Sequence, residues 1–207
     1  MCTLSKIAKN ILTDKGPSGH GYTDFYDQYL NKYRDFHGNM IEIGVGRGGS
    51  VILWHNYFHN AIINMIDIDD KKDMSVFDLE RSVFHNGDQG DSDFLNSVCE
   101  NISPFFIVDD GCHMPDLQIK TFESLFPQLC SGGIYIIEDI SGYSDGIDIL
   151  KYFYNQIEEG INFKISSYKM GNIQQVREYF ENEGITLPTF QIETIHFYRN
   201  CIVILKI

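Results

Sequence analysis

The stretch "IEIGVGRGGSVILWHNYF", residues Ile41–Phe58, decides the fold because it passes from a strand through a glycine-rich turn into a helix. The run "NMIEIG" predicts a short buried strand, and "GSVILWHNYF" predicts the helix that follows. Glycines in such a turn let the backbone bend sharply and approach a ligand closely. The stretch therefore predicts the first strand–turn–helix unit of an α/β sheet, with a cofactor at the turn.

The remaining chain repeats this alternation of strands and helices. Further core strands are predicted in "AIINMIDID", "PFFIVDD" and "GGIYIIEDI", and helices in "YTDFYDQYLNKYRD", "DSDFLNSVCENI", "PDLQIKTFESLFPQL", "IDILKYFYNQIEEG" and "IQQVREYFENEG". Such alternation is typical of a parallel sheet that is covered on both faces. The last runs, "QIETIHFY" and "CIVILKI", are separated by Arg199 and Asn200 alone and predict an antiparallel hairpin.

Composition indicates one globular domain over residues 1–207, in the cytoplasm. The chain is 43% hydrophobic and carries a net charge of −13, which disfavours nucleic acid and anionic lipid as partners. It has no apolar run of the roughly 18 residues that span a membrane, and we expect no signal peptide. Its five cysteines form no CxxC pair and are expected to be free thiols. A small-molecule substrate is therefore expected.

The acid before the glycine turn favours S-adenosylmethionine over NAD as the cofactor. Glu42 precedes the turn residues, of which Gly44, Gly46, Gly48 and Ser50 are predicted to bind the cofactor. A dinucleotide would bring a pyrophosphate, which an acid disfavours, whereas S-adenosylmethionine brings a sulfonium and an ammonium. The alternative for such a loop is a turn without a ligand.

Two further acidic positions are candidates for the cofactor's ribose and adenine. Asp67, or its rival Asp69, ends the second strand about twenty residues beyond the glycines, where an acid commonly binds a ribose. Asp88, followed by Gln89, lies in a turn where a carboxylate could accept the adenine amine. A helix cap is the alternative, and it is the better interpretation for Asp91.

Acidic pairs end two core strands, in "FIVDDGCHMPD" (Phe106–Asp116) and "IYIIEDI" (Ile134–Ile140). Ligands of an open parallel sheet bind beyond the carboxyl ends of its strands, so Asp110, Glu138 and Asp139 are expected to converge there. Carboxylates with no neighbouring Lys or Arg in the sequence suit a hard divalent cation such as Mg²⁺. The bland alternative is that these acids cap the following helices.

Taken together, the motifs resemble a known family, the metal-dependent class I S-adenosylmethionine methyltransferases of the macrocin and mycinamicin sugar O-methyltransferase type. The resemblance runs from about Thr13 to Ile140, through "TDKGPSGHGYTDFY", "IEIGVGRGGS", "MIDID", "GDQGDSDFL", "FIVDDGCHMPD" and "GGIYIIEDI". It implies a Rossmann-like fold with a mostly parallel seven-stranded sheet and a C-terminal antiparallel hairpin. Cys112 stands where the family usually has serine.

The resemblance also implies roles for individual residues. His113 would be the general base beside Asp110, and Asp110, Glu138 and Asp139 would bind Mg²⁺. Residues 1–35 would form a helical lid. The implied cofactor-binding residues are Glu42, Gly44, Gly46, Gly48, Ser50, Asp67, Asp69, Asp88, Gln89, Thr13 and Lys15, with Asp14 in the same lid segment.

We therefore expect metal-assisted methylation of a hydroxyl on a sugar, sugar nucleotide or glycoside. Tyr22, Tyr26 and Tyr143 are candidates for the acceptor pocket, although helical spacing equally makes Tyr22 and Tyr26 core residues. The alternatives are a catechol-type O-methyltransferase, an oxidative enzyme of the cephalosporin hydroxylase type and a non-catalytic cofactor-binding partner subunit. A homo-oligomer is compatible with all of them.

Overall fold

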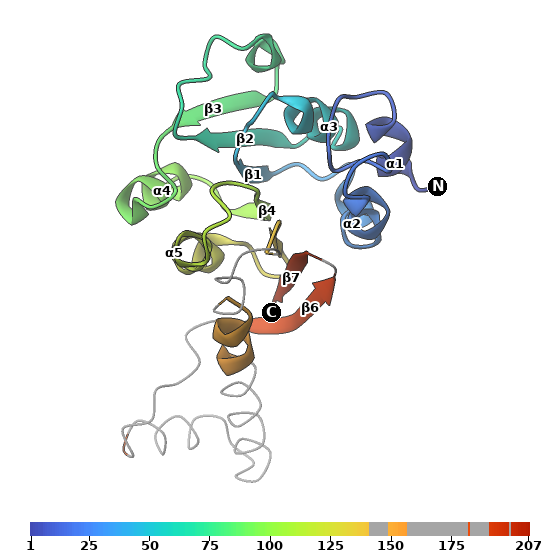
Figure 1. Cartoon of the computed structure of the whole chain (residues 1–207). Coiled ribbons are helices and arrows are strands. Elements are labelled where there is room, and N and C mark those ends of the chain that lie inside the picture. The colour runs from blue at the N-terminus through green and yellow to red at the C-terminus, as the bar shows by residue number, and fades with distance from the viewer. Residues whose placement is uncertain (141–148, 157–181, 183–190, 199) are drawn as a thin grey trace.

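The computed structural model describes residues 1–140, 149–156, 182, 191–198 and 200–207 (Figure 1). The strands are β1 (Asn39–Ile43), β2 (Ile62–Asp67), β3 (Ser82–Asn86), β4 (Pro104–Asp109), β5 (Ile134–Ile137), β6 (Ile192–Tyr198) and β7 (Cys201–Lys206). The α-helices are α1 (Thr3–Ala8), α2 (Tyr22–Leu30), α3 (Gly49–Tyr57), α4 (Ser92–Cys99) and α5 (Pro115–Leu125), and residues 149–156 are also helical. Short 3₁₀ turns are η1 (Asn31–Tyr33), η2 (Ser75–Asp78) and η3 (Phe126–Gln128).

One seven-stranded sheet runs in the order β3-β2-β1-β4-β5-β7-β6. Neighbouring strands from β3 to β5 pair in parallel. β7 pairs antiparallel with both β5 and β6, so the C-terminal hairpin inserts its second strand beside β5. The α/β class, the parallel sheet and the terminal hairpin are thereby confirmed.

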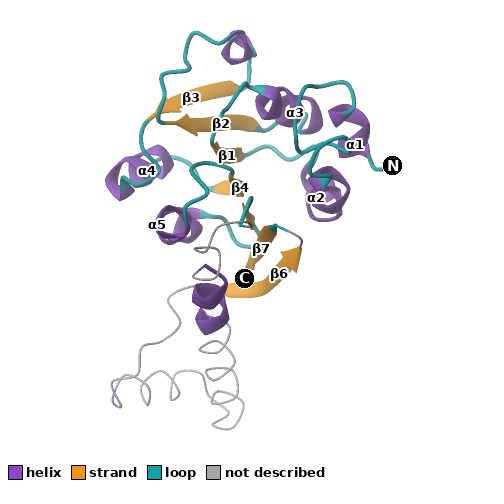
Figure 2. Cartoon of the chain, viewed as in Figure 1, coloured by secondary structure: helices purple, strands orange, loops and turns teal. Residues whose placement is uncertain are grey.

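Helices cover both faces of the sheet (Figure 2). On one face α1, α2 and α3 pack against it through a core that includes Leu4, Phe25 and Trp54. On the other face α4, α5 and the helix at residues 149–156 share a second core with Phe122 and Phe153. Successive strand residues alternate between the two cores, because side chains in a strand point to opposite faces. A strand buried on both faces carries mostly apolar side chains, which explains the long apolar runs in these strands.

Local sequence signals set several helix ends. Asp91 caps α4, since its side chain accepts hydrogen bonds from the backbone amides of Asp93 and Phe94. Pro115 is the first residue of α5, where its missing amide hydrogen costs nothing. The predicted helix over residues 22–35 stops earlier, because α2 ends at Leu30 and the chain continues as η1. The ends predicted near Gly160 and Gly184 lie outside the described residues.

Candidate active site

The glycine turn lies between β1 and α3, at the carboxyl end of the sheet. Its conformation depends on glycine, because Gly44, Gly46 and Gly48 all have positive φ angles, of 92°, 51° and 81°. Asp67, at the end of β2, accepts a 3.0 Å hydrogen bond from the backbone amide of Val45 and so fixes the turn. The sequence pattern thus places these elements where a cofactor loop requires them.

The three glycines do different things. A Cβ on Gly44 would lie 2.1 Å from the carbonyl oxygen of Asp110, so the two loops touch backbone to backbone there. A Cβ on Gly48 would meet Met74 and Val76 in the protein interior. A Cβ on Gly46 would meet nothing within 4 Å, so its exposed side is open to a ligand.

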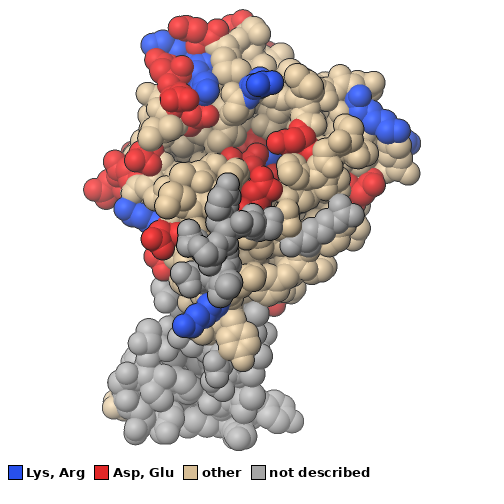
Figure 3. Space-filling model, viewed as in Figure 1, with Lys and Arg blue, Asp and Glu red and all other residues tan. Residues whose placement is uncertain are grey.

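A cavity of about 650 Å³ lies against this turn. Three parts of the chain line it: the N-terminal segment, the glycine turn and the ends of β4 and β5. The lining residues are Leu12, Thr13, Asp14, Ser18, Gly19, Gly44, Val45, Gly46, Arg47, Gly49, Ser50, Asp110, His113 and Asp139. One cavity therefore brings together the glycine turn and the residues beyond the acidic strand ends. On the face seen in Figure 3, acidic side chains gather near the middle of the molecule.

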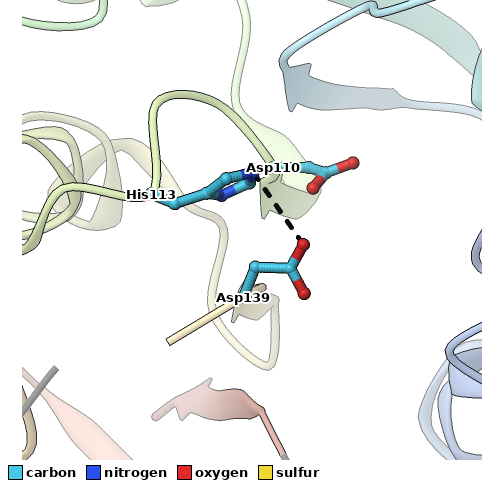
Figure 4. Close-up of side chains that lie close together, drawn as sticks. All are labelled: Asp110, His113 and Asp139. Carbon is cyan, nitrogen blue, oxygen red and sulfur yellow. Dashed lines mark ion pairs between the residues drawn. The ribbon is translucent and has the colours of Figure 1, made fainter. Parts of the chain in front are cut away.

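Asp110, His113 and Asp139 form a group that could hold a metal ion (Figure 4). Each offers one ligand atom, and these atoms lie within 4.8 Å of one another. Nε2 of His113 lies 3.8 Å from Oδ2 of Asp139. His113 and Asp139 also have positive φ angles of 55° and 53°, a conformation that costs energy outside glycine and concentrates at functional sites.

Lys15 supplies a cation that the sequence analysis did not place among these acids. Its side chain is 1% exposed, and Nζ donates to Asp110 Oδ2 at 2.5 Å and to both carboxylate oxygens of Glu138 at 2.9 Å. Glu42 Oε1 lies 3.3 Å from the same nitrogen. Burial alone lowers the pKa of Lys15, but the three carboxylates raise it well above its ordinary value. Lys15 is therefore an ammonium at neutral pH.

This contact changes how two predicted site residues are interpreted. Glu42 is fully buried, receives a 2.9 Å hydrogen bond from Trp54 Nε1 and does not line the cavity. Burial raises the pKa of Glu42 to about 7. Glu138, predicted to be a metal ligand beside Asp139, directs both carboxylate oxygens to Lys15. The structure therefore brings Asp110 and Asp139 together with His113, while Glu138 lies behind them.

Gln89 holds the loop that carries His113. Its Oε1 accepts a 2.6 Å hydrogen bond from the backbone amide of Cys112, and its Nε2 donates to Thr121 Oγ1 at 3.2 Å. The buried carboxyl of Asp109 accepts from the amide of Gly111 at 3.2 Å within the same loop. Burial raises the pKa of Asp109 to about 7. Gln89 thus faces the loop beyond β4 and does not line the cavity.

The remaining predicted residues are distributed around the turn. Asp69 is exposed, and its backbone amide donates to Asp67 Oδ1 at 2.9 Å. Asp88 is also exposed and accepts a 2.7 Å hydrogen bond from the amide of Gly90. Neither residue lines the cavity, whereas Thr13 and Ser50 do.

Tyr22 and Tyr26 belong to the core and not to the cavity lining. The hydroxyl of Tyr22 donates a 2.8 Å hydrogen bond to Asp139 Oδ1, so Tyr22 holds the Asp139 carboxylate from the core side. Tyr143 lies outside the described residues. Arg47 lines the cavity, yet the sequence analysis assigned it no role. Its place between two glycines of the predicted cofactor turn was the signal that could have identified it.

The sheet order, the glycine turn after β1 and the antiparallel β7 beside β5 define a Rossmann-like methyltransferase fold. No protein-family model matches the chain. Demethylmacrocin O-methyltransferase from Streptomyces fradiae is 34% identical to it over 145 residues. Mycinamicin VI 2''-O-methyltransferase from Micromonospora griseorubida is 33% identical over 145 residues. Both matches cover 66% of this chain and 36% of the relative.

A solved structure shows the same similarity over the whole chain. The MycE methyltransferase from the mycinamycin biosynthetic pathway, in complex with Mg and SAH, superposes with a TM-score of 0.81 at 26% identity. That match covers 99% of this chain and 54% of MycE. The resemblance to the macrocin and mycinamicin sugar O-methyltransferases is thereby confirmed. The chain spans about a third of the length of the curated relatives and about half of MycE.

Within the described residues, no helix combines the length and the apolar character needed to cross a bilayer.

Proposed function

We propose that the chain transfers a methyl group from S-adenosylmethionine to a hydroxyl of a sugar or glycosylated small molecule, assisted by a divalent cation. The observation that carries this proposal is the single cavity lined by the glycine turn and by Asp110, His113 and Asp139. A methyl donor and an acceptor hydroxyl must meet at one place, and residues that could hold a cofactor and a cation line this one cavity. Residues 1–35 are proposed to cover it, since Leu12, Thr13 and Asp14 already form part of its wall.

The residues of the turn fit the cofactor. The open side of Gly46 admits a ligand against the backbone, and Ser50 adds a hydroxyl at the start of α3. Gly44, Gly48, Thr13 and Lys15 are proposed to shape this part of the site. Asp67 or Asp69 would meet the ribose and Asp88 the adenine end, as the resemblance implies, and Gln89 would act indirectly by holding the loop after β4. Glu42 would act from behind the cavity wall, through its contact with Lys15. Bound S-adenosylmethionine would supply the electrophilic methyl group.

The donor atoms near the strand ends fit a divalent cation. Carboxylate oxygens suit Mg²⁺, and an imidazole nitrogen is also accepted by other divalent metals. Asp110 and Asp139 would hold the cation, with Glu138 as the third carboxylate that the resemblance implies. Such a cation would lower the pKa of an acceptor hydroxyl.

His113 is proposed to accept the proton from the acceptor hydroxyl. It lies at the cavity wall, and its Nε2 is 3.8 Å from Oδ2 of Asp139. Imidazole changes its protonation state near neutral pH, which suits a general base. Asp110 would hold the acceptor beside His113. The cavity walls would keep the hydroxyl and the methyl donor in register, an effect that lowers the barrier substantially.

The acceptor class is inferred from the relatives. Their names describe O-methylation of macrolide and tetracenomycin glycosides, and one MycE structure contains mycinamycin VI. These statements concern the relatives, so a glycoside acceptor for this chain is part of the proposal.

Calorimetry with S-adenosylhomocysteine and with NADH tests the cofactor assignment directly. We expect binding of S-adenosylhomocysteine and none of NADH, because the acidic side chains that line the cavity, Asp14, Asp110 and Asp139, disfavour a pyrophosphate. Tight NADH binding with no response to S-adenosylhomocysteine would end the proposal.

A further inference from the structure

The ammonium of Lys15 lies at the centre of a buried acidic cluster. It contacts Asp110, Glu138 and Glu42 at 2.5, 2.9 and 3.3 Å, and its side chain is only 1% exposed. One positive charge therefore faces three carboxylates inside the protein. Buried carboxylates are costly unless a partner compensates them. Lys15 is the nearest compensating charge that the structure provides.

Lys15 reaches this cluster from outside the sheet. Glu42, Asp110 and Glu138 lie at or just beyond the ends of β1, β4 and β5, whereas Lys15 belongs to the N-terminal segment between α1 and α2. Its carbonyl oxygen accepts a 3.1 Å hydrogen bond from the amide of Thr23, which anchors it to α2. The ammonium thus ties three strand ends to a segment that also lines the cavity.

The same contacts overlap with the proposed metal site. Lys15 Nζ donates hydrogen bonds to both carboxylate oxygens of Glu138 and to Oδ2 of Asp110. Glu138 and Asp110 are both proposed metal ligands. An ammonium and a divalent cation repel one another at such short range. A cation that recruits Glu138 must therefore draw its carboxylate away from Lys15.

We infer that Lys15 is a positioning residue that acts as the resident cation of this cluster. It holds Asp110 and Glu138 in place in the metal-free chain and competes with a divalent cation for their oxygens. This inference rests on the metal site in the proposed function. A purely structural ion pair makes a different prediction, because its loss would destabilise the fold without tightening metal binding.

The test is a titration of the full chain with Mn²⁺, in which the electron paramagnetic resonance signal measures the concentration of free Mn²⁺. Lys15→Met removes the ammonium but keeps the length of the side chain. We expect it to bind Mn²⁺ about tenfold more tightly or better, since one repelling charge is gone from the contact shell. Adding Asp139→Asn to this variant should abolish the gain, because the ion then loses a proposed ligand.

Lys206→Met is the matched control. Lys206 Nζ donates to the carbonyl oxygens of Pro127 and Leu129, at 2.8 and 2.6 Å. Its neighbour Leu205 pairs with Ile134 at the start of β5, the opposite end of that strand from Glu138. Loss of Lys206 should leave Mn²⁺ affinity unchanged. If Lys15→Met does not fold, the double variant Lys15→Met, Glu42→Gln takes its place. It removes one buried negative charge and keeps Asp110 and Glu138, the two residues shared by Lys15 and the proposed metal site. Glu42→Gln alone is the reference for this double variant.

Thermal unfolding gives a second measurement. In EDTA, Lys15→Met should unfold at a lower temperature than the wild type, and Mn²⁺ should restore much of the difference. Adding Glu138→Gln should also restore part of it in EDTA, because one uncompensated carboxylate is removed.

The outcomes separate the two proposals. If the wild type binds Mn²⁺ and Lys15→Met binds it no more tightly, the proposed role of Lys15 is overturned and the metal site stands. If Lys15→Met binds Mn²⁺ and the wild type does not, the competition between Lys15 and the cation is supported, and metal use by the wild type is contradicted. Absence of Mn²⁺ binding in both would overturn the metal site and the competition together.

Discussion

At the scale of single residues, His113 is the side chain on which the proposed chemistry depends most. His113→Ala should lower kcat by roughly two orders of magnitude or more, as loss of a general base does. Affinity for S-adenosylhomocysteine and Mg²⁺ should change little. The measurement is a steady-state assay with an acceptor that the wild type methylates, together with calorimetry of both ligands.

His113→Gln serves as its companion, because glutamine resembles histidine in size and is not basic. It should be impaired to a similar degree. Recovery of the rate of either variant at high Mg²⁺ would instead identify His113 as a metal ligand, which its place within 4.8 Å of Asp110 and Asp139 allows. Asp110 would then be the first candidate for the base.

The glycines of the turn offer a matched pair of substitutions. Gly46→Ala places a methyl group in open space, at a strain of about 1–2 kcal/mol for the left-handed backbone. It should weaken S-adenosylhomocysteine binding, because the methyl group occupies the ligand's side of the turn. Calorimetry measures this loss, and unchanged affinity would show that the cofactor does not approach Gly46.

Gly44→Ala should act on the fold instead. Its Cβ would lie 2.1 Å from the carbonyl oxygen of Asp110, so the two loops must separate. We expect a clearly larger fall in melting temperature than for Gly46→Ala. Equal melting temperatures for the two variants would contradict the close approach of these loops.

At the scale of elements, the loop between β4 and α5 depends on Gln89. Gln89→Ala removes the acceptor of the Cys112 amide and the donor to Thr121, and a typical hydrogen bond contributes about 0.5–1.5 kcal/mol to stability. Denaturant unfolding should show this loss of stability, and kcat should fall because His113 is no longer held. Unaltered stability would show that the loop keeps its conformation without Gln89.

The sheet could be predicted from the sequence because its strands are buried on both faces. β1, β2, β4 and β5 consist largely of continuous apolar residues between glycines and acids, and such runs admit few alternatives. β3 was not among the strands predicted from the residues, since this edge strand has no fully buried residue. Edge strands carry a weaker pattern for this reason.

The acidic strand ends could be located by the same reasoning, but their partner could not. Lys15 is 95 residues from Asp110 and 123 residues from Glu138, so no local pattern connects them. The absence of a neighbouring Lys or Arg in the sequence therefore did not reveal that Lys15 contacts these acids in the fold. Similarly, the helical spacing of Tyr22 could not show whether its side chain lies in the core or in the acceptor pocket. The ring of Tyr22 lies in the core, and its hydroxyl donates a hydrogen bond to Asp139.

At the scale of the whole molecule, the candidate site lies at the carboxyl end of the sheet. The carboxyl ends of β1, β4 and β5 bring Glu42, Asp110 and Glu138 together, and the N-terminal segment closes over them through Lys15. Residues 141–148 and most of 157–190 lie outside the described part of the chain.

The central claim is that a methyl donor and a divalent cation share one cavity. Its most direct test is a crystal structure of the chain grown with S-adenosylhomocysteine and Mn²⁺, with anomalous diffraction to locate the metal. We predict an anomalous peak at about 2.0–2.3 Å from carboxylate oxygens of Asp110 and Asp139, near the usual range for such ions. The sulfur of S-adenosylhomocysteine should lie in the same cavity, beside Gly46. A cation bound elsewhere, or a cofactor outside this cavity, would contradict the account.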